Sequence, residues 1–310
     1  MKEKLSKTSI VCIIALFCCS LWGSAFPCIK IGYSVFRIES SETASQILFA
    51  GIRFTLAGLL SVCIGSIVGK KLLLPSGKNI HKIALLSIFQ TILQYLFFYI
   101  GLAHTTGVKS SIIKGANVFI VILVSSLVFR QEKLSARNLV ACVIGFAGVV
   151  IINLGGGGLS FEMSFAGEGV IFLSMLANSM SSVLMKKFSK DENPVLLSGY
   201  QFMLGGIVMI LCGAFMGGRL EYTGLSSFGI LIYLAFLSAA AYSLWSLLLK
   251  YNPVSRVAVY SFATPVMGVV FSMLLLDESS QSFGLRGFAA LLLICAGIYI
   301  VNSKKKEAAD

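Results

Sequence analysis

Charged side chains are scarce in this chain. Only 12% of its 310 residues are Asp, Glu, Lys or Arg, against roughly 25% in an ordinary soluble domain. The hydrophobic residues reach 57%, and the mean hydropathy is +0.90. A membrane-spanning helix needs about 20 apolar residues, so ten such helices would take roughly 200 positions and leave only short loops and tails. This composition excludes a water-soluble protein and leaves no room for a separate soluble domain.

The residues and motifs of common catalytic and metal sites are also missing. The two histidines, His81 and His104, stand alone, and the sequence contains no HExxH, no Gly-x-Ser-x-Gly and no Walker motif. The eight cysteines all lie inside apolar runs and form no CxxC pair, which is typical of small buried side chains rather than of redox or metal ligands. We therefore expect no catalytic residue, no metal and no cofactor.

Long apolar runs, separated by charge clusters and by breaks rich in Gly, Pro or Asn, fill most of the chain. In lipid, every backbone N–H and C=O group must be paired within its own segment, so runs of this length are helices despite their many β-branched residues. The sequence thus predicts an all-α membrane protein with ten transmembrane helices. The ten spans are expected at 8–30, 46–69, 81–103, 108–129, 136–154, 168–187, 194–217, 228–249, 254–276 and 285–302.

The net charge of +12 comes from 25 Lys and Arg residues that sit mainly between the apolar runs. In that position they act as orientation signals, and we expect no nucleic-acid partner. With a cytoplasmic N-terminus, 18 of them fall on the inner side and five on the outer side, leaving only Arg53 and Lys114 inside spans. This asymmetry predicts a multi-pass protein of the cell (inner or plasma) membrane with both termini in the cytoplasm.

The two halves of the sequence are similar to each other. Residues 137–153 and 286–302 share six identities in 17 ungapped positions, and residues 51–58 match 199–206 at four positions. Each half contains five spans, and because five is odd, matched segments must cross the membrane in opposite directions. The sequence therefore predicts two inverted five-helix repeats related by a pseudo-two-fold axis in the membrane plane, the architecture of alternating access. A duplication of this kind can also serve a purely structural bundle.

The repeat defines the expected domains. We place the first five-helix repeat at 1–155, the second at 168–303, and a basic cytoplasmic tail at 304–310. Glu132, which follows the fourth span, pairs with Glu278, which follows the ninth. Inversion would put Glu132 on the inner side and Glu278 on the outer side.

Several motifs, in this order and spacing, resemble the drug/metabolite transporter superfamily, specifically its EamA-type ten-helix permeases. They are WGSAFPCIK at 22–30, Gly-x-Arg-Phe at 51–54, FRQEKLS at 129–135, GFAGVVIIN at 145–153, ATPVMGVVFSMLLLDES at 263–279 and CAGIYIV at 295–301. The resemblance implies a carrier with a central cavity between its halves, which moves small metabolites such as amino acids or their derivatives. One departure is that Phe119 stands where the family tends to carry a proline, as at Pro265.

Lys114 and Arg53 are the two cations inside spans, and no Asp or Glu lies in the interior of any span. A cation at the centre of a spanning helix costs about 2.5 to 3.5 kcal/mol, so something must compensate each of them. One interpretation is a water-filled cavity in which they attract an anionic group of a substrate. The alternative is that both long side chains extend toward the outer surface.

Polar and aromatic side chains recur on several spans. Gln90 and Gln94, like Ser174 and Asn178, are four residues apart and so share a helix face. Such groups either line a substrate cavity or form hydrogen bonds between helices. The candidate substrate-binding residues are Lys114, Arg53, Gln90, Gln94, Asn117, Asn178, Tyr200, Gln201, Tyr242, Trp245 and Tyr260.

These features together predict a secondary transporter of small anionic or zwitterionic metabolites that works by alternating access, and not an enzyme. The alternatives are a gated channel, which would not saturate or show counterflow, and a membrane-embedded enzyme. The expected partners are a small-molecule metabolite and membrane lipid, with a homodimer as a further option.

The topology can be tested with reporter fusions after residue 158 and after residue 310. Five spans separate the two positions, so the reporters should lie on opposite sides of the membrane, with the one at 310 in the cytoplasm. The same side at both positions would contradict the ten-span arrangement.

Overall fold

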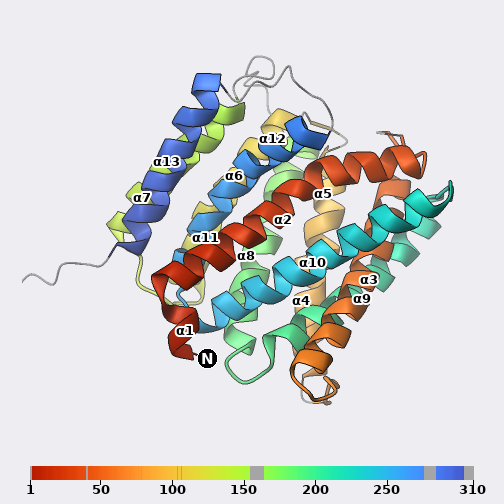
Figure 1. Cartoon of the computed structure of the whole chain (residues 1–310), viewed down its shortest axis with the longest axis horizontal. Helices are drawn as coiled ribbons and strands as arrows, with labels where there is room; N and C mark the ends of the chain where they lie inside the picture. Colours follow the sequence, from red (N-terminus) through yellow and green to blue (C-terminus); the bar gives the residue numbers. More distant parts are fainter. Residues whose placement is uncertain are drawn as a thin grey trace, which may run out of the picture.

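The computed structural model describes residues 2–153, 164–275 and 284–303, apart from the single positions 40, 78, 103 and 106. The described residues form helices joined by short turns (Figure 1). The helices are α1 (Lys2–Ser6), α2 (Thr8–Val35), α3 (Thr43–Val68), α4 (Ile80–Leu86), η1 (Ser87–Leu93), α5 (Gln94–Leu102), α6 (Gly107–Leu123), η2 (Val124–Val128), α7 (Ala136–Asn153), η3 (Phe165–Gly169), α8 (Val170–Phe188), α9 (Pro194–Phe215), α10 (Leu225–Tyr251), α11 (Val254–Ala258), η4 (Val259–Phe262), α12 (Ala263–Leu275) and α13 (Gly284–Asn302).

The ten predicted spans are confirmed as helical segments. Seven continuous segments are long and apolar enough to cross a membrane, and three further apolar helices, within α6–η2, α7 and α13, are shorter. Most predicted ends lie within three residues of the observed ones, but the first helix continues beyond Lys30 to Val35. The charge of Lys30 does not end the helix, because this exposed side chain lies in the lining of a cavity between the helices.

Close packing of α3 against α9 shows the inverted repeat directly. A Cβ atom on Gly58 would lie 2.5 Å from the carbonyl oxygen of Gly199, and one on Gly51 would lie 2.9 Å from that of Gly206. Gly51 corresponds to Gly199 in the repeat and Gly58 to Gly206, so one two-fold rotation exchanges these two contacts. The same rotation exchanges Phe54 and Phe202, whose rings stack with centroids 5.2 Å apart.

The pair α7 and α13, at the other end of the molecule, repeats this arrangement. A Cβ on Gly148 would lie 2.8 Å from the carbonyl oxygen of Ala290, and one on Gly297 would lie 2.7 Å from that of Ala141. These four residues are again two repeat-related pairs. The chain is therefore an all-α membrane protein built of two inverted five-helix repeats.

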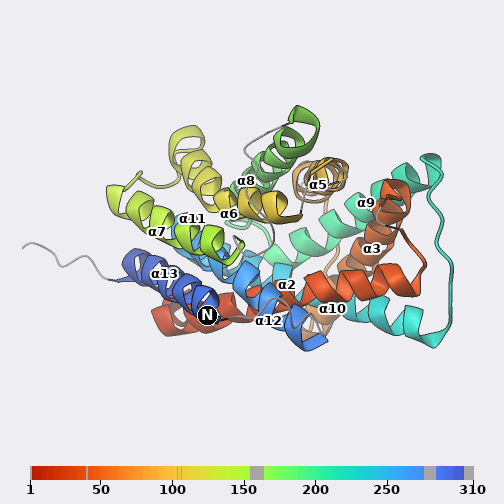
Figure 2. The ribbon, with the colours of Figure 1, turned by 90° about the horizontal axis from the view of Figure 1, so that it is seen from above.

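Two layers of helices face each other between these end pairs. Figure 2 shows α2, α10 and α12 in one layer and α5, α6 and α8 in the other, with α3 and α9 at one side and α7 and α13 at the opposite side. Each layer combines helices from both halves of the chain. We call the end of the bundle at which α2 begins, α11 begins and α13 ends the basal end.

Hydrogen bonds at the basal end join the two halves. The Glu192 carboxylate, from the second half, accepts hydrogen bonds from Lys82 at 3.0 Å and from Asn79 at 3.3 Å. The Lys82 ammonium holds the pKa of the Glu192 carboxyl below its usual range. The Arg137 guanidinium binds the carbonyl oxygens of Ile300 and Ser303 at the end of α13. The predicted tail at 304–310 and Glu278 lie outside the described residues.

Candidate functional site

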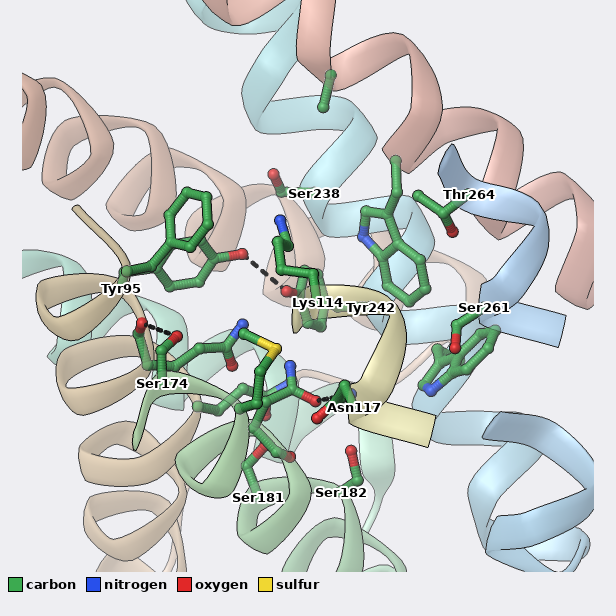
Figure 3. Close-up of a pocket in the computed structure, with 18 of the residues that line it drawn as sticks. Tyr95, Lys114, Asn117, Ser174, Ser181, Ser182, Ser238, Tyr242, Ser261 and Thr264 are labelled. Atoms are coloured by element: carbon green, nitrogen blue, oxygen red, sulfur yellow. Dashed lines mark hydrogen bonds between the residues drawn. The ribbon is translucent and has the colours of Figure 1, made fainter. Parts of the chain in front are cut away.

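A cavity of about 480 Å³ lies between the two layers. Its lining comes from both halves of the chain, mainly from α2, α5, α6, α8, α10 and α12 (Figure 3). This is the size and position expected of a small-molecule site between the helices of a bundle.

Most of the predicted site residues lie around this cavity. The eight in its lining are Arg53, Gln90, Gln94, Lys114, Asn117, Asn178, Tyr242 and Trp245. The other three, Tyr200, Gln201 and Tyr260, are not in the lining. The aromatic residues Trp22, Phe26 and Tyr95 also line it.

Tyr200, Gln201 and Tyr260 are engaged elsewhere. The Tyr200 hydroxyl donates to the Leu73 carbonyl oxygen at 3.0 Å. Gln201 is fully buried and accepts a hydrogen bond from the Thr91 hydroxyl at 2.7 Å. Tyr260 is 1% exposed and belongs to the hydrophobic core at the basal end. Gln201 and Tyr260 are the repeat mates of Arg53 and Lys114, so only the first-half members of these two pairs reach the cavity.

Helical periodicity explains which side chains face the cavity. On each of three helices, most of the lining residues recur every three or four positions, singly or as adjacent pairs, which places them on one face. They are Ser110, Lys114, Asn117, Val118 and Val121 on α6; Ser174, Asn178, Ser181, Ser182 and Met185 on α8; and Ser238, Tyr242, Trp245, Ser246 and Leu249 on α10. Sequence reasoning missed Ser238, Ser246 and Met185, although each continues a spacing that already includes a predicted residue.

The ammonium group of Lys114 is held by aromatic rings rather than by a carboxylate. Its Nζ atom lies 4.3 Å from the ring centroid of Phe98 and 5.2 Å from that of Phe26. Such cation–π contacts contribute about 0.5 to 2 kcal/mol, more when the cation is desolvated. Lys114 therefore points into the cavity beside Tyr95 and Tyr242 (Figure 3), instead of extending along α6 to the surface.

Arg53 is the second buried cation of the site. Only 4% of the residue is exposed, and its guanidinium carbon lies 4.3 Å from the Phe54 ring centroid. Its Nε and Nη1 atoms are buried and have no hydrogen-bond partner among the described residues. A buried arginine N–H without an acceptor is costly, so these two groups are available to an incoming acceptor or to water.

Other polar groups of the cavity fall into two sets. One set is bonded within the protein: the Tyr95 and Tyr242 hydroxyls are 2.8 Å apart, and the Asn117 amide donates to the Asn178 oxygen at 3.1 Å. The other set has buried polar atoms without a partner among the described residues, and it comprises Trp22 Nε1, Gln90 Oε1, Gln94 Oε1 and Thr264 Oγ1. These atoms converge on one space, which is typical of a site completed by ligand or water.

A carboxylate at the basal end of the bundle binds the start of α11. Glu132, in the turn between η2 and α7, accepts hydrogen bonds from the backbone N–H of Val254 at 2.5 Å and of Ser255 at 3.2 Å, and from the Ser255 hydroxyl. The Ser125 hydroxyl donates to it at 3.0 Å. A carboxylate at a helix N-terminus is favoured by the free N–H groups and the helix dipole. Glu132 thus ties the first half of the chain to the start of α11.

Comparison with protein families gives one match that spans nearly the whole chain. The model of the EamA-like transporter family matches residues 9–154 and 165–303. The two matched segments correspond to the two structural repeats.

Individual relatives agree with this match. An uncharacterized transporter of Archaeoglobus fulgidus is 29% identical over 300 residues, covering 94% of this chain and 99% of its own. The uncharacterized transporter YvbV of Bacillus subtilis is 26% identical, and the match covers 98% of this chain and 95% of that protein. A WAT1-related chloroplastic protein of Arabidopsis thaliana is 24% identical, and the match covers 91% of this chain and 66% of that protein. A solved crystal structure of 16% identity covers 95% of this chain and 96% of that chain with a TM-score of 0.76, which shows a shared fold.

Single cysteines can test whether the cavity is reached by water. In a variant lacking the native cysteines, Gln94→Cys, Asn178→Cys and Tyr242→Cys should react with a small water-soluble thiol reagent, because all three side chains line the cavity. The matched control is Gln201→Cys, since Gln201 is fully buried away from it. If the three cavity cysteines react no faster than the control, these residues pack between helices and do not line an accessible site.

Proposed function

Because the chain belongs to the EamA-like transporter family, we propose that it is a secondary carrier that moves a small anionic or zwitterionic metabolite across the membrane by alternating access. The observation that carries this proposal is the cavity between the repeats, into which Lys114 and Arg53 both face while its described lining contains no Asp or Glu. Two buried cations without a carboxylate partner are expensive unless an anionic group binds them.

The two repeats, 1–155 and 168–303, are the bodies that would move relative to each other. Their contacts at α3–α9 lie on the pseudo-two-fold axis, where a rocking motion displaces atoms least. Their contacts at the basal end, such as Glu132 with α11, are far from the axis and must separate when that end opens. We propose that the basal end, with both termini and the 304–310 tail, is cytoplasmic, because the basic residues favour that side.

The family and the relatives are transporters, and this supports a role in transport rather than in catalysis. Among the described residues, no cluster of three or more His, Cys, Asp or Glu side chains could hold a metal ion. The cavity instead offers fixed positive charge, neutral hydrogen-bonding groups and aromatic walls. These are features for binding a solute.

Lys114 provides the direct test of the site. After a metabolite panel has identified a substrate in reconstituted vesicles, Lys114→Met should reduce its transport at least about tenfold, because a buried charge–charge hydrogen bond contributes roughly 1.5 to 3 kcal/mol. Lys114→Arg should retain part of the activity, since it keeps the charge. Lys187→Met, at an exposed lysine near the end of α8, is the matched control and should transport normally. Wild-type rate and saturation in Lys114→Met would remove Lys114 from the site.

Glu132 provides a test of alternating access. Glu132→Gln keeps the shape but removes the charge that holds the N-terminus of α11, so the basal end should open more often. A cysteine placed at Met185, a buried residue of the cavity lining, should then react several-fold faster with a thiol reagent added from the cytoplasmic side. Glu221→Gln is the control, because its ion pair with Arg37 is largely exposed. An unchanged labelling rate would show that Glu132 does not restrain the basal opening.

A further inference from the structure

Among the described residues, the cavity lining contains the cations Arg53 and Lys114 and no Asp or Glu. Lys114 and Arg53 line the same cavity, and like charges in one poorly solvated space repel each other. The potential inside the cavity is therefore positive, and in a site shielded from water such a potential acts strongly on the charge of a ligand.

Arg53 presents the geometry for an oxyanion. Its unpartnered Nε and Nη1 groups lie in one plane on a side chain that is 4% exposed. Guanidinium groups pair with carboxylates through two parallel N–H···O bonds, and a fixed, buried guanidinium loses little freedom when it does so. The Nε and Nη1 groups point to opposite sides of the guanidinium, so a ligand carboxylate would pair with Nη2 together with one of them and leave the other to water or to a second acceptor.

An ammonium group finds no carboxylate partner in the described lining. The ring faces of Phe98 and Phe26 are already in contact with the Lys114 ammonium, and the other aromatic rings carry no formal charge that would balance a second cation. The unpartnered Gln90 Oε1 and Gln94 Oε1 are neutral acceptors, which suit a hydroxyl, an amide N–H or water but do not neutralise a charge. An α-ammonium next to a bound carboxylate would share the cavity with Arg53 and Lys114 and would be repelled by both.

The rest of the lining is suited to a flat apolar body. Trp22 packs edge-on against Tyr242 and Trp245, with ring centroids 5.2 and 4.9 Å away. Together with Tyr95 and Phe98 they form an aromatic wall next to the cations. Aromatic ligands pack well against such rings in offset or edge-on geometry.

We infer that the cavity selects an organic anion with a flat apolar body and no ammonium group, and so discriminates against zwitterionic amino acids. This inference rests on the proposed function and narrows its substrate class. It assigns to Arg53 the direct binding of the oxyanion.

The chain contains its own reporter for this binding. Its only two tryptophans, Trp22 and Trp245, both line the cavity, so a change in tryptophan emission reports on the site. We would titrate the purified, lipid-reconstituted protein at neutral pH with three probes that share one aromatic body: 3-phenylpropanoate, phenylalanine and 2-phenylethylamine. They differ only in carrying a carboxylate, both charged groups, or an ammonium.

We expect a saturable emission change with 3-phenylpropanoate. Phenylalanine should bind at least about tenfold more weakly, and 2-phenylethylamine should not bind at the same concentrations. Arg53→Gln should weaken 3-phenylpropanoate at least about tenfold, and Arg53→Lys should weaken it less because it keeps the charge. Arg37→Gln, at an exposed arginine outside the cavity, should bind like the wild type. Thermal unfolding of each variant identifies any variant that fails to fold. If Arg53→Gln fails to fold, Arg53→Lys still tests the role of Arg53.

Phenylalanine that binds as tightly as 3-phenylpropanoate would overturn the inference while leaving the transport proposal intact. So would 3-phenylpropanoate affinity that is unchanged in Arg53→Gln, or an absence of binding by all three probes. A different result would contradict the transport proposal itself, namely the absence of saturable uptake or efflux of any metabolite in vesicles.

Discussion

The close crossing of α3 and α9 determines how the two halves of this protein are arranged. Glycines at Gly51, Gly58, Gly199 and Gly206 bring the two backbones into direct contact, and each contact recurs under the pseudo-two-fold rotation. In a membrane the hydrophobic effect does not drive helices together. Helix association there depends on close van der Waals packing, which small residues at such crossings allow. The layers that enclose the cavity diverge from this crossing and meet again at α7 and α13.

The cavity concentrates polar groups that the fold itself does not satisfy. Buried atoms of Arg53, Trp22, Gln90, Gln94 and Thr264 lack partners among the described residues, and all five residues line the same space. A bundle selected only for stability would pair or replace such groups, since each costs about 1 to 3 kcal/mol when left unpaired. Their convergence from both halves supports the proposal that a ligand binds in this cavity.

The helices, and most of the predicted residues that line the cavity, follow from the sequence, because apolar runs and helical spacing reflect the physics of lipid and of the α-helix. Lys114 and Asn117 on α6, and Asn178 on α8, were recognised in this way. The sequence could not show that Gln201 and Tyr260 lie outside the cavity. They correspond to Arg53 and Lys114 in the second repeat, and hydropathy does not reveal that the second repeat buries them. Ser238 and Ser246 were missed because a serine in a span is equally compatible with packing.

The π-helical segments have a consequence for how the cavity wall is built. In η1 (Ser87–Leu93) the backbone bonds run from i to i+5, so the third span holds an extra residue compared with a continuous α-helix. One extra residue turns everything after it by about 100°. The apolar face of α4, with Ile83 and Leu86, can therefore pack into the core while Gln94 and Phe98 of α5 face the cavity. A single inserted position thus reorients half of a membrane span without breaking its chain of backbone hydrogen bonds.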